Sequence, residues 1–335
     1  TLSRLLQWPI FPDILSQIRS YPSGNGVIPY YDLILKALFP NEDIAPDAVL
    51  QFGDHFVSKK LTDWIAFKKP KVHFCVAPHS LRKDPLHSVT CRINCDPSDL
   101  CEALTLHLPG RSPLNWLTFW KELNDSAREG LTSYFNKKEM KLSEPLIFHK
   151  LSSFLPSKSA LFLSNSMPIR DANTFFCPKY KIGPIFGNRG VSGIDGNLAT
   201  AIGIAKALEK PLLAIVGDLT FLHDLTSLAQ LKELNLSIHF LVINNNGGGI
   251  FHSLPIAKKK KVFDKFFKTP HGLNLEHTAN LFDLSYENPK SLKELKEALA
   301  TSQTSIIEVK TNAENNLHTT KEIISHIKEI QTSLR

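Results

Sequence analysis

Short apolar runs alternate with longer amphipathic stretches along most of this chain. The second half shows this most clearly, with expected strands at residues 160–164, 212–216, 238–243 and 305–309, and expected helices at 197–208, 224–234, 292–299 and 319–330. Apolar runs without alternation, such as the second and third of these strands, are typical of parallel strands buried on both faces. The pattern therefore predicts an α/β domain with a doubly wound parallel sheet.

The first half repeats the alternation less regularly. We expect strands at 48–52 and 72–76 and helical segments at 32–38, 58–67 and 114–135. A polar segment at 136–142 precedes Ser143-Glu144-Pro145, which is typical of a helix start. The length of 335 residues suits two domains. We therefore predict two doubly wound parallel-sheet domains, residues 1–140 and 141–335.

Composition excludes several classes of protein. The chain is 42% hydrophobic and 21% charged, which is ordinary for a globular protein. Its longest apolar stretches are far shorter than the ~18–20 residues that cross a bilayer, so we expect no membrane-spanning segment. The five cysteines show no paired spacing and the start shows no secretory pattern. Free thiols in a cytoplasmic protein are the simplest interpretation.

The formal net charge of +7 permits an anionic partner. The one dense basic run, residues 258–261, continues through Lys265 and Lys268 with phenylalanines between. A solvated loop leading into a short helix with an inward phenylalanine face explains this run better than a nucleic-acid site, because no nucleic-acid-binding motif accompanies it. We expect no nucleic-acid partner.

Polar residues follow two of the expected strands. Gly217 and Asp218 come directly after residues 212–216, and Asn245 with three glycines follows residues 238–243. Ligands of doubly wound sheets bind beyond the carboxyl ends of the strands, where these residues would meet. Carboxylate and amide oxygens suit Mg²⁺, and glycines let the backbone approach a phosphate. A diphosphate site with its metal is the prediction, although each piece alone would also suit a turn or a flexible linker.

Gly217-Asp218-Leu219, followed one strand later by Asn245-Asn246, resembles the thiamine-diphosphate signature. Residues 164–171, 187–196, 245–255 and 269–273 look like the corresponding strings of the 2-succinyl-5-enolpyruvyl-6-hydroxy-3-cyclohexene-1-carboxylate (SEPHCHC) synthase family. Leucine in the third position of the signature is usual in that family and favours it over other thiamine-diphosphate decarboxylases. Thr226 departs from the family, where asparagine is frequent.

The resemblance implies three domains, of which this chain is similar to the middle and the C-terminal diphosphate-binding ones. The family's activating glutamate belongs to an N-terminal pyrimidine-binding domain, so we name no catalytic residue here and expect the chain alone to be inactive. Thr1 would then mark a domain boundary. The family's cofactor lies between subunits, which implies a homodimer or homotetramer with a shared active site.

The resemblance also implies roles for individual residues. The Mg²⁺ ligands, with Mn²⁺ as an alternative ion, are expected to be Asp218, Asn245 and the carbonyl of Gly247. Contacts to thiamine diphosphate are expected from Gly217, Leu219, Thr220, Ile194, Ile250 and Phe251. Contacts to substrate are expected from Ser166, Arg170, Arg189, Lys59 and Leu254. His252 and His271 are interpreted as structural.

The reaction implied by the resemblance belongs to menaquinone biosynthesis. It decarboxylates 2-oxoglutarate and adds the succinyl unit to isochorismate. Both substrates are dianions, which suits the planar fork of arginine. Two alternatives stay open: another thiamine-diphosphate lyase for a 2-oxo acid, similar to acetolactate synthase, and a non-catalytic relic or binding subunit.

Overall fold

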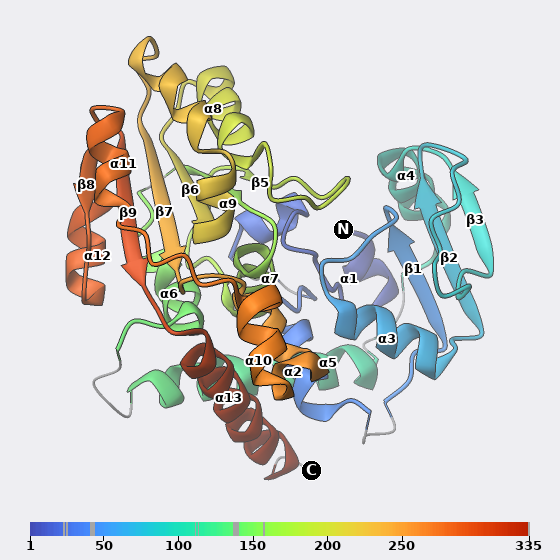
Figure 1. Cartoon of the computed structure of the whole chain (residues 1–335). Coiled ribbons are helices and arrows are strands. Elements are labelled where there is room, and N and C mark those ends of the chain that lie inside the picture. The colour runs from blue at the N-terminus through green and yellow to red at the C-terminus, as the bar shows by residue number, and fades with distance from the viewer. Residues whose placement is uncertain are drawn as a thin grey trace. The chain divides into compact units, whose positions relative to one another are not determined.

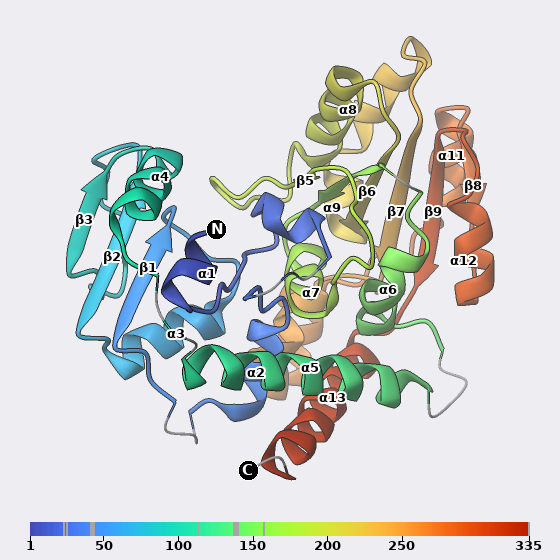
Figure 2. The same cartoon turned by 180° about the vertical axis from the view of Figure 1, so that it is seen from behind.

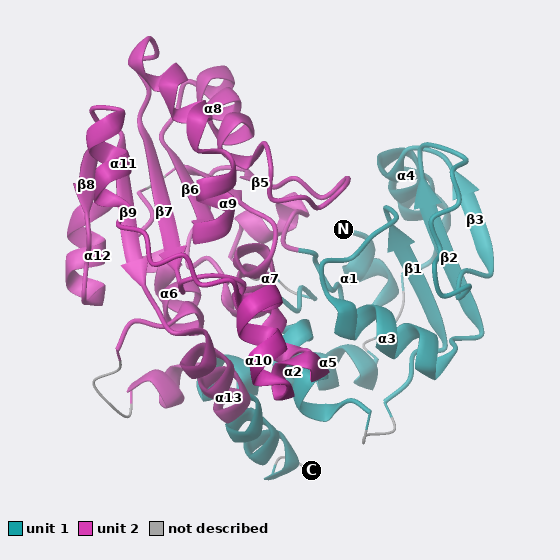
Figure 3. Cartoon of the chain, in the orientation of Figure 1, with its two compact units in different colours: residues 1–13, 23–130, 324–335 teal, residues 14–22, 131–323 magenta. Residues whose placement is uncertain are grey.

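The computed structural model describes residues 1–22, 24, 26–40, 44–110, 112, 114–136, 141–156 and 158–333. The chain forms two compact units, the first comprising Thr1–Asp13, Ser23–Gly130 and Ile324–Arg335 and the second Ile14–Pro22 and Leu131–Ile323 (Figure 3). The division falls within α5 (Asn115–Asn136) and α13 (Ala313–Ser333). The boundary expected at residue 140 lies outside the described residues, and the division into 1–140 and 141–335 stays a prediction.

The first unit contains a parallel sheet in the order β1-β2-β3 (Figure 1), with β1 at Ala48–Phe52, β2 at Val72–Ala77 and β3 at Cys91–Asn94. Helix α3 (Lys59–Lys68) connects β1 to β2, and Ser58 caps it by accepting a hydrogen bond from the Leu61 N–H at 3.0 Å. The strands and the helix expected in this region are confirmed. The unit's other helices are α1 (Leu2–Leu6), α2 (Tyr31–Leu38) and α4 (Pro97–His107).

The second unit contains a six-stranded parallel sheet in the order β5-β4-β6-β7-β9-β8. Its strands are β4 (Ala160–Leu163), β5 (Ile185–Phe186), β6 (Leu212–Gly217), β7 (Ile238–Asn244), β8 (Ser285–Glu287) and β9 (Ser305–Lys310). After β4 the chain adds β5 on one side and then β6 on the other. This reversal creates a crevice at the carboxyl ends of β4 and β6, where ligands of such sheets bind. The predicted α/β class with parallel sheets is confirmed.

Neighbouring side chains along a strand point to opposite faces of a sheet, and helices bury both faces of this one. On one face, Phe162 and Phe240 share a core with Leu198 of α8 (Asn197–Leu208). On the other, α7 (Met167–Phe175) contacts β4 and β6 and packs beside α6 (Glu144–Lys150) (Figure 2). The remaining helices of the unit are α9 (Asp218–His223), α10 (Lys260–Phe263), α11 (Glu276–Leu281) and α12 (Leu292–Ala298).

One predicted helix differs in type from the expectation. The segment expected as a helix at 224–234 is a 3-10 helix at Leu225–Lys232. The carboxylate of Asp224 contacts two elements: its Oδ1 accepts a hydrogen bond from the Ser227 hydroxyl of this segment at 2.7 Å, and its Oδ2 accepts from the N–H groups of Leu198 and Ala199 at 2.7 and 3.0 Å. Asp224 therefore caps α8, which comes earlier in the chain.

The strands β5 and β8 were not predicted, because two or three residues are too few to show a periodic pattern.

The basic run forms the short helix expected for it. Helix α10 begins at Lys260, Phe263 is buried, and a π-helical turn follows at Asp264–Lys268. Only part of the phenylalanine face turns inward, because the side chain of Phe266 is 65% exposed. No helix within the described part of the chain is long and apolar enough to cross a membrane.

Candidate functional site

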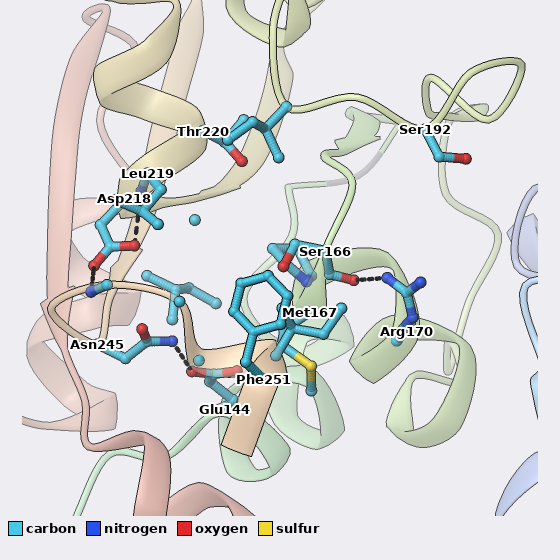
Figure 4. Close-up of a pocket in the computed structure, with 18 of the residues that line it drawn as sticks. Glu144, Ser166, Met167, Arg170, Ser192, Asp218, Leu219, Thr220, Asn245 and Phe251 are labelled. Carbon is cyan, nitrogen blue, oxygen red and sulfur yellow. Dashed lines mark hydrogen bonds between the residues drawn. The ribbon is translucent and has the colours of Figure 1, made fainter. Parts of the chain in front are cut away.

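The loops that follow β4, β6 and β7 meet at one edge of the second unit's sheet and enclose a pocket of about 250 Å³ (Figure 4). Every predicted site residue except Lys59 and Leu254 lines it: Ser166, Arg170, Arg189, Ile194, Gly217, Asp218, Leu219, Thr220, Asn245, Gly247, Ile250 and Phe251. The structure therefore brings these residues together, and the register places Gly217 beside Ile243 at the carboxyl end of the sheet. Their roles toward a cofactor, metal or substrate stay predictions.

Asp218 stands at the start of α9 and is 2% exposed. Its Oδ1 accepts a hydrogen bond from the Leu219 N–H at 2.7 Å, and its Oδ2 accepts one from the Gly247 N–H at 2.8 Å. Burial raises the pKa of this carboxyl, while the hydrogen bonds from Gly247, Leu219 and His271 act in the opposite direction. A bound cation would stabilise the ionised form further.

Asn245 lies directly after β7, and the two ends of its side-chain amide have different surroundings. Its Nδ2 donates to Oε1 of Glu144 at 3.0 Å. Its Oδ1 is buried and has no hydrogen-bond partner among the described residues. A buried acceptor without a partner carries a free-energy penalty of about 1–3 kcal/mol, so this oxygen fits a ligand supplied from the pocket.

Gly247 needs to be glycine. Its φ is +130°, and a Cβ built there would lie 2.0 Å from the carbonyl oxygen of Lys268. The loop can therefore fold against the segment after α10 only without a side chain at this position. The N–H of Gly247 in the same loop donates to Oδ2 of Asp218 at 2.8 Å.

These atoms fit a divalent cation. No three His, Cys, Asp or Glu side chains converge on a metal-sized site in the part of the chain that the structure describes. The candidate set instead combines the carboxylate of Asp218 and the amide oxygen of Asn245 with the carbonyl of Gly247. Such hard oxygens, together with phosphate oxygens and water, are what Mg²⁺ prefers.

Glu144 lines the same pocket and was missed by the sequence analysis. It is the first residue of α6 and is 3% exposed. Burial raises the pKa of its carboxyl, partly offset by the hydrogen bond from Asn245. Ser143-Glu144-Pro145 indicated only a helix start. The contact with Asn245 joins residues about a hundred positions apart, and no local pattern could reveal it.

His271 contacts the candidate metal ligand Asp218, although the sequence indicated only a structural role. Its Nδ1 accepts a hydrogen bond from the Leu273 N–H at 3.0 Å, so the ring proton is on Nε2. Nε2 lies 3.2 Å from Oδ2 of Asp218 and donates to it. His252 instead packs edge-on against Phe263 and does not line the pocket.

Two arginines lie at the side of the pocket formed by the loop after β4. Ser166 has a φ of +74° and precedes α7, and its carbonyl accepts a hydrogen bond from Arg170. Arg189 donates to Oδ1 of Asn165 at 3.0 Å. Burial, and then the positive charge of Arg189, lower the pKa of Arg170. Two neighbouring cations beside a pocket favour an anionic occupant.

Lys59 and Leu254 do not line this pocket. Lys59 belongs to the first unit, where its ammonium pairs with Asp63 one turn along α3, at 2.7 Å. Leu254 is 45% exposed and lies between two 3-10 turns, Gly249–Ser253 and Pro255–Lys258. Their expected contacts with substrate stay predictions.

Two family models match the chain in succession. Residues 1–163 match the model described as "Middle domain of thiamine pyrophosphate". Residues 172–309 match "Thiamine pyrophosphate enzyme, C-terminal TPP binding domain", a range that contains the loops after β6 and β7. The expected middle and cofactor-binding parts of a thiamine-diphosphate enzyme are therefore present.

Curated relatives resemble the chain along nearly its whole length. The SEPHCHC synthase of Rubrobacter xylanophilus is 38% identical over 96% of this chain, which covers 56% of that protein. Those of Salinibacter ruber and Geobacillus thermodenitrificans are 37% and 36% identical, each over 94% of the chain and 54% of the relative. The chain thus spans about half the length of the curated relatives it matches.

Proposed function

Because this chain belongs to the thiamine-diphosphate enzymes and is similar to about half of a SEPHCHC synthase, we propose that it forms the diphosphate- and metal-binding part of such an active site. The proposed reaction decarboxylates 2-oxoglutarate and adds the succinyl unit to isochorismate. The observation that carries the proposal is the convergence of Asp218, Gly247 and Asn245 in one pocket at the switch point of the sheet, where the side-chain oxygen of Asn245 has no partner in the described part of the chain.

We assign the metal and diphosphate contacts from the chemistry of the lining residues. Asp218, Asn245 and the Gly247 carbonyl would hold Mg²⁺, or Mn²⁺ in its place, against the diphosphate. Gly217, Leu219 and Thr220 would contact the diphosphate, since Gly217 ends β6 and Thr220 lies in the first turn of α9. When bound, thiamine diphosphate supplies the electron sink that makes loss of carbon dioxide feasible.

The remaining lining residues would bind and enclose the substrates. Arg170 and Arg189 place two positive charges where a dicarboxylate could bind, and the Ser166 carbonyl orients Arg170. Ile194, Ile250 and Phe251 would form apolar walls that exclude water from the reacting atoms.

A second subunit would complete the site. The pocket of about 250 Å³ is smaller than the ~300–1,000 Å³ usual for a small-molecule site, and it suits a diphosphate with its cation better than a whole cofactor with substrate. We therefore propose a homodimer or homotetramer, in which a pyrimidine-binding surface outside residues 1–335 contributes the activating glutamate. The cytoplasmic location expected from the cysteine pattern is part of the same proposal.

The proposal is tested by supplying the pyrimidine-binding domain of a SEPHCHC synthase to this chain. The expected result is consumption of isochorismate that requires 2-oxoglutarate, thiamine diphosphate and Mg²⁺. Asp218→Ala should abolish it, whereas Lys71→Ala, which removes an exposed ion pair with Asp47 in the other unit, serves as the control for any general loss. Activity with pyruvate in place of 2-oxoglutarate would indicate another lyase. Absence of cofactor binding by calorimetry would indicate a non-catalytic subunit.

A further inference from the structure

We propose that Glu144 is a positioning residue that turns the side-chain amide of Asn245 so that its oxygen, and not its nitrogen, faces the cation in the pocket. The inference rests on the proposed function, because it assigns a cation to this site. Glu144 itself need not touch the ion. Its role is to accept one hydrogen bond and thereby fix which end of an amide remains free.

Glu144 is held in place independently of Asn245. Its backbone N–H donates to Oδ1 of Asn316 at 3.1 Å, and Nδ2 of Asn316 returns a hydrogen bond to Oε1 at 2.7 Å. Thr311, directly after β9, donates to the same oxygen at 3.3 Å. The carboxylate is therefore anchored by α13 and the end of β9, and Asn245 adapts to it.

The chemistry of the contact decides the orientation of the amide. Oε1 of Glu144 accepts hydrogen bonds from Asn245, Asn316 and Thr311, so only the NH₂ end of Asn245 can face it. This acceptor role does not depend on whether the other carboxyl oxygen carries a proton. The amide oxygen then lies on the opposite side of the planar group, where it is buried without a partner among the described residues (Figure 4).

Turning the side-chain amide of Asn245 by 180° would be unfavourable for two reasons. The oxygen of Asn245 would meet Oε1 of Glu144, and the NH₂ group would meet the cation. Glu144 excludes this arrangement before any cation arrives, so the pocket is pre-organised for an oxygen ligand. Residues that orient metal ligands typically change metal affinity by about 10–100-fold when they are removed.

Three variants separate orientation from charge and from stability. Glu144→Met removes the acceptor. Glu144→Gln keeps an oxygen that can take the place of Oε1 but cannot carry a negative charge. Thr311→Val removes another donor to the same carboxylate and leaves the contact with Asn245 intact. Thermal unfolding of each variant shows how much of it is folded at the temperature of the binding measurement.

The measurement is the affinity of the chain for Mn²⁺ in the presence of thiamine diphosphate, followed by the loss of the free-Mn²⁺ electron paramagnetic resonance signal. We expect Glu144→Met to weaken binding by about tenfold or more, and Glu144→Gln and Thr311→Val to stay within about threefold of wild type. A wild-type affinity in Glu144→Met would overturn the proposal. Equal losses in Glu144→Gln and Glu144→Met would also overturn it, since charge would then explain the effect.

Two outcomes separate the proposed function from the role of Glu144. A wild-type chain that binds no Mn²⁺ with thiamine diphosphate contradicts the proposed function, and the role of Glu144 falls with it. A wild-type chain that binds Mn²⁺ while Glu144→Met binds it equally well leaves the proposed function standing and removes only the positioning role.

Discussion

At the scale of single residues, the three consecutive asparagines that begin with the last residue of β7 have three different roles. Asn244 donates to the buried carboxylate of Glu308 and accepts from the Asn246 N–H at 2.9 Å. Asn246, with a φ of +61°, accepts from the N–H groups of His271 and Gly272 at 3.1 and 2.8 Å. Of the three, Asn245 is the one whose side-chain oxygen has no hydrogen-bond partner among the residues that the structure describes. The outer two therefore shape the loop that presents the middle one.

Gly247→Ala should disrupt this loop, because the new methyl group would meet the carbonyl oxygen of Lys268 at a backbone angle that L-residues rarely adopt. We expect a loss of about 1–3 kcal/mol in the free energy of unfolding, measured by urea titration. Gly203→Ala is the matched control. Gly203 lies in α8 with open space around it, and alanine there should raise stability by about 0.5–1 kcal/mol. Equal effects at the two positions would contradict this account of the loop.

At the scale of elements, α7 depends on a residue far away in the sequence. The carbonyls of its last turn lie beyond the regular hydrogen bonds of the helix, apart from that of Ala172, which accepts from the Phe176 N–H at 3.0 Å. Arg19, which is 2% exposed, donates from Nη2 to the carbonyls of Ala172 and Asn173 at 3.3 and 3.4 Å, and also to that of Phe176. A cation at this end is also favoured by the helix dipole. The helix that carries Arg170 is thus fixed from the opposite end.

Arg19→Met should therefore destabilise the chain more than a surface substitution does. Methionine keeps an apolar stem but leaves buried carbonyls without a charged donor, so we expect a loss of about 2–4 kcal/mol in thermal or urea unfolding. Arg4→Met, at an exposed position in α1, should change stability by less than about 0.5 kcal/mol. If Arg19→Met proved as stable as the control, water would have to satisfy these carbonyls.

At the scale of the whole molecule, sequence order and compact units do not coincide. Residues 14–22 belong to the second unit although they come from the beginning of the chain. The Ile182 N–H donates to the Ser20 carbonyl at 2.9 Å, and Gln17 exchanges hydrogen bonds with the backbone of Ile185 at 3.0 and 3.2 Å. The edge strand β5 is therefore held by an early segment.

A chain shortened to residues 141–335 should consequently recover stability when a peptide of residues 14–22 is added. With the peptide at about a hundred times its dissociation constant, we expect the melting temperature to rise by about 5–10 °C. A scrambled peptide of the same composition serves as the control. An equal melting temperature with both peptides would show that residues 141–335 form a self-sufficient domain.

The sequence by itself determined the parallel sheets and the chemistry at their edge. Strands such as β6 and β7 are buried on both faces, so nearly every position must be apolar, and Asp218 and Asn245 are conspicuous directly where these runs end. Ligand loops sit at the carboxyl ends of such strands. The pocket could therefore be predicted from local patterns together with the family resemblance.

Only the tertiary structure decided which side chains support those ligands. Glu144 reaches Asn245, His271 reaches Asp218, and Arg19 reaches α7 across long intervals of sequence. Such contacts depend on how elements pack, and a buried hydrogen bond between distant residues leaves no periodic signal. The ligands of the site follow from where strands end, whereas their orientation follows from the packing of α6, α13 and the loop after β9 around them.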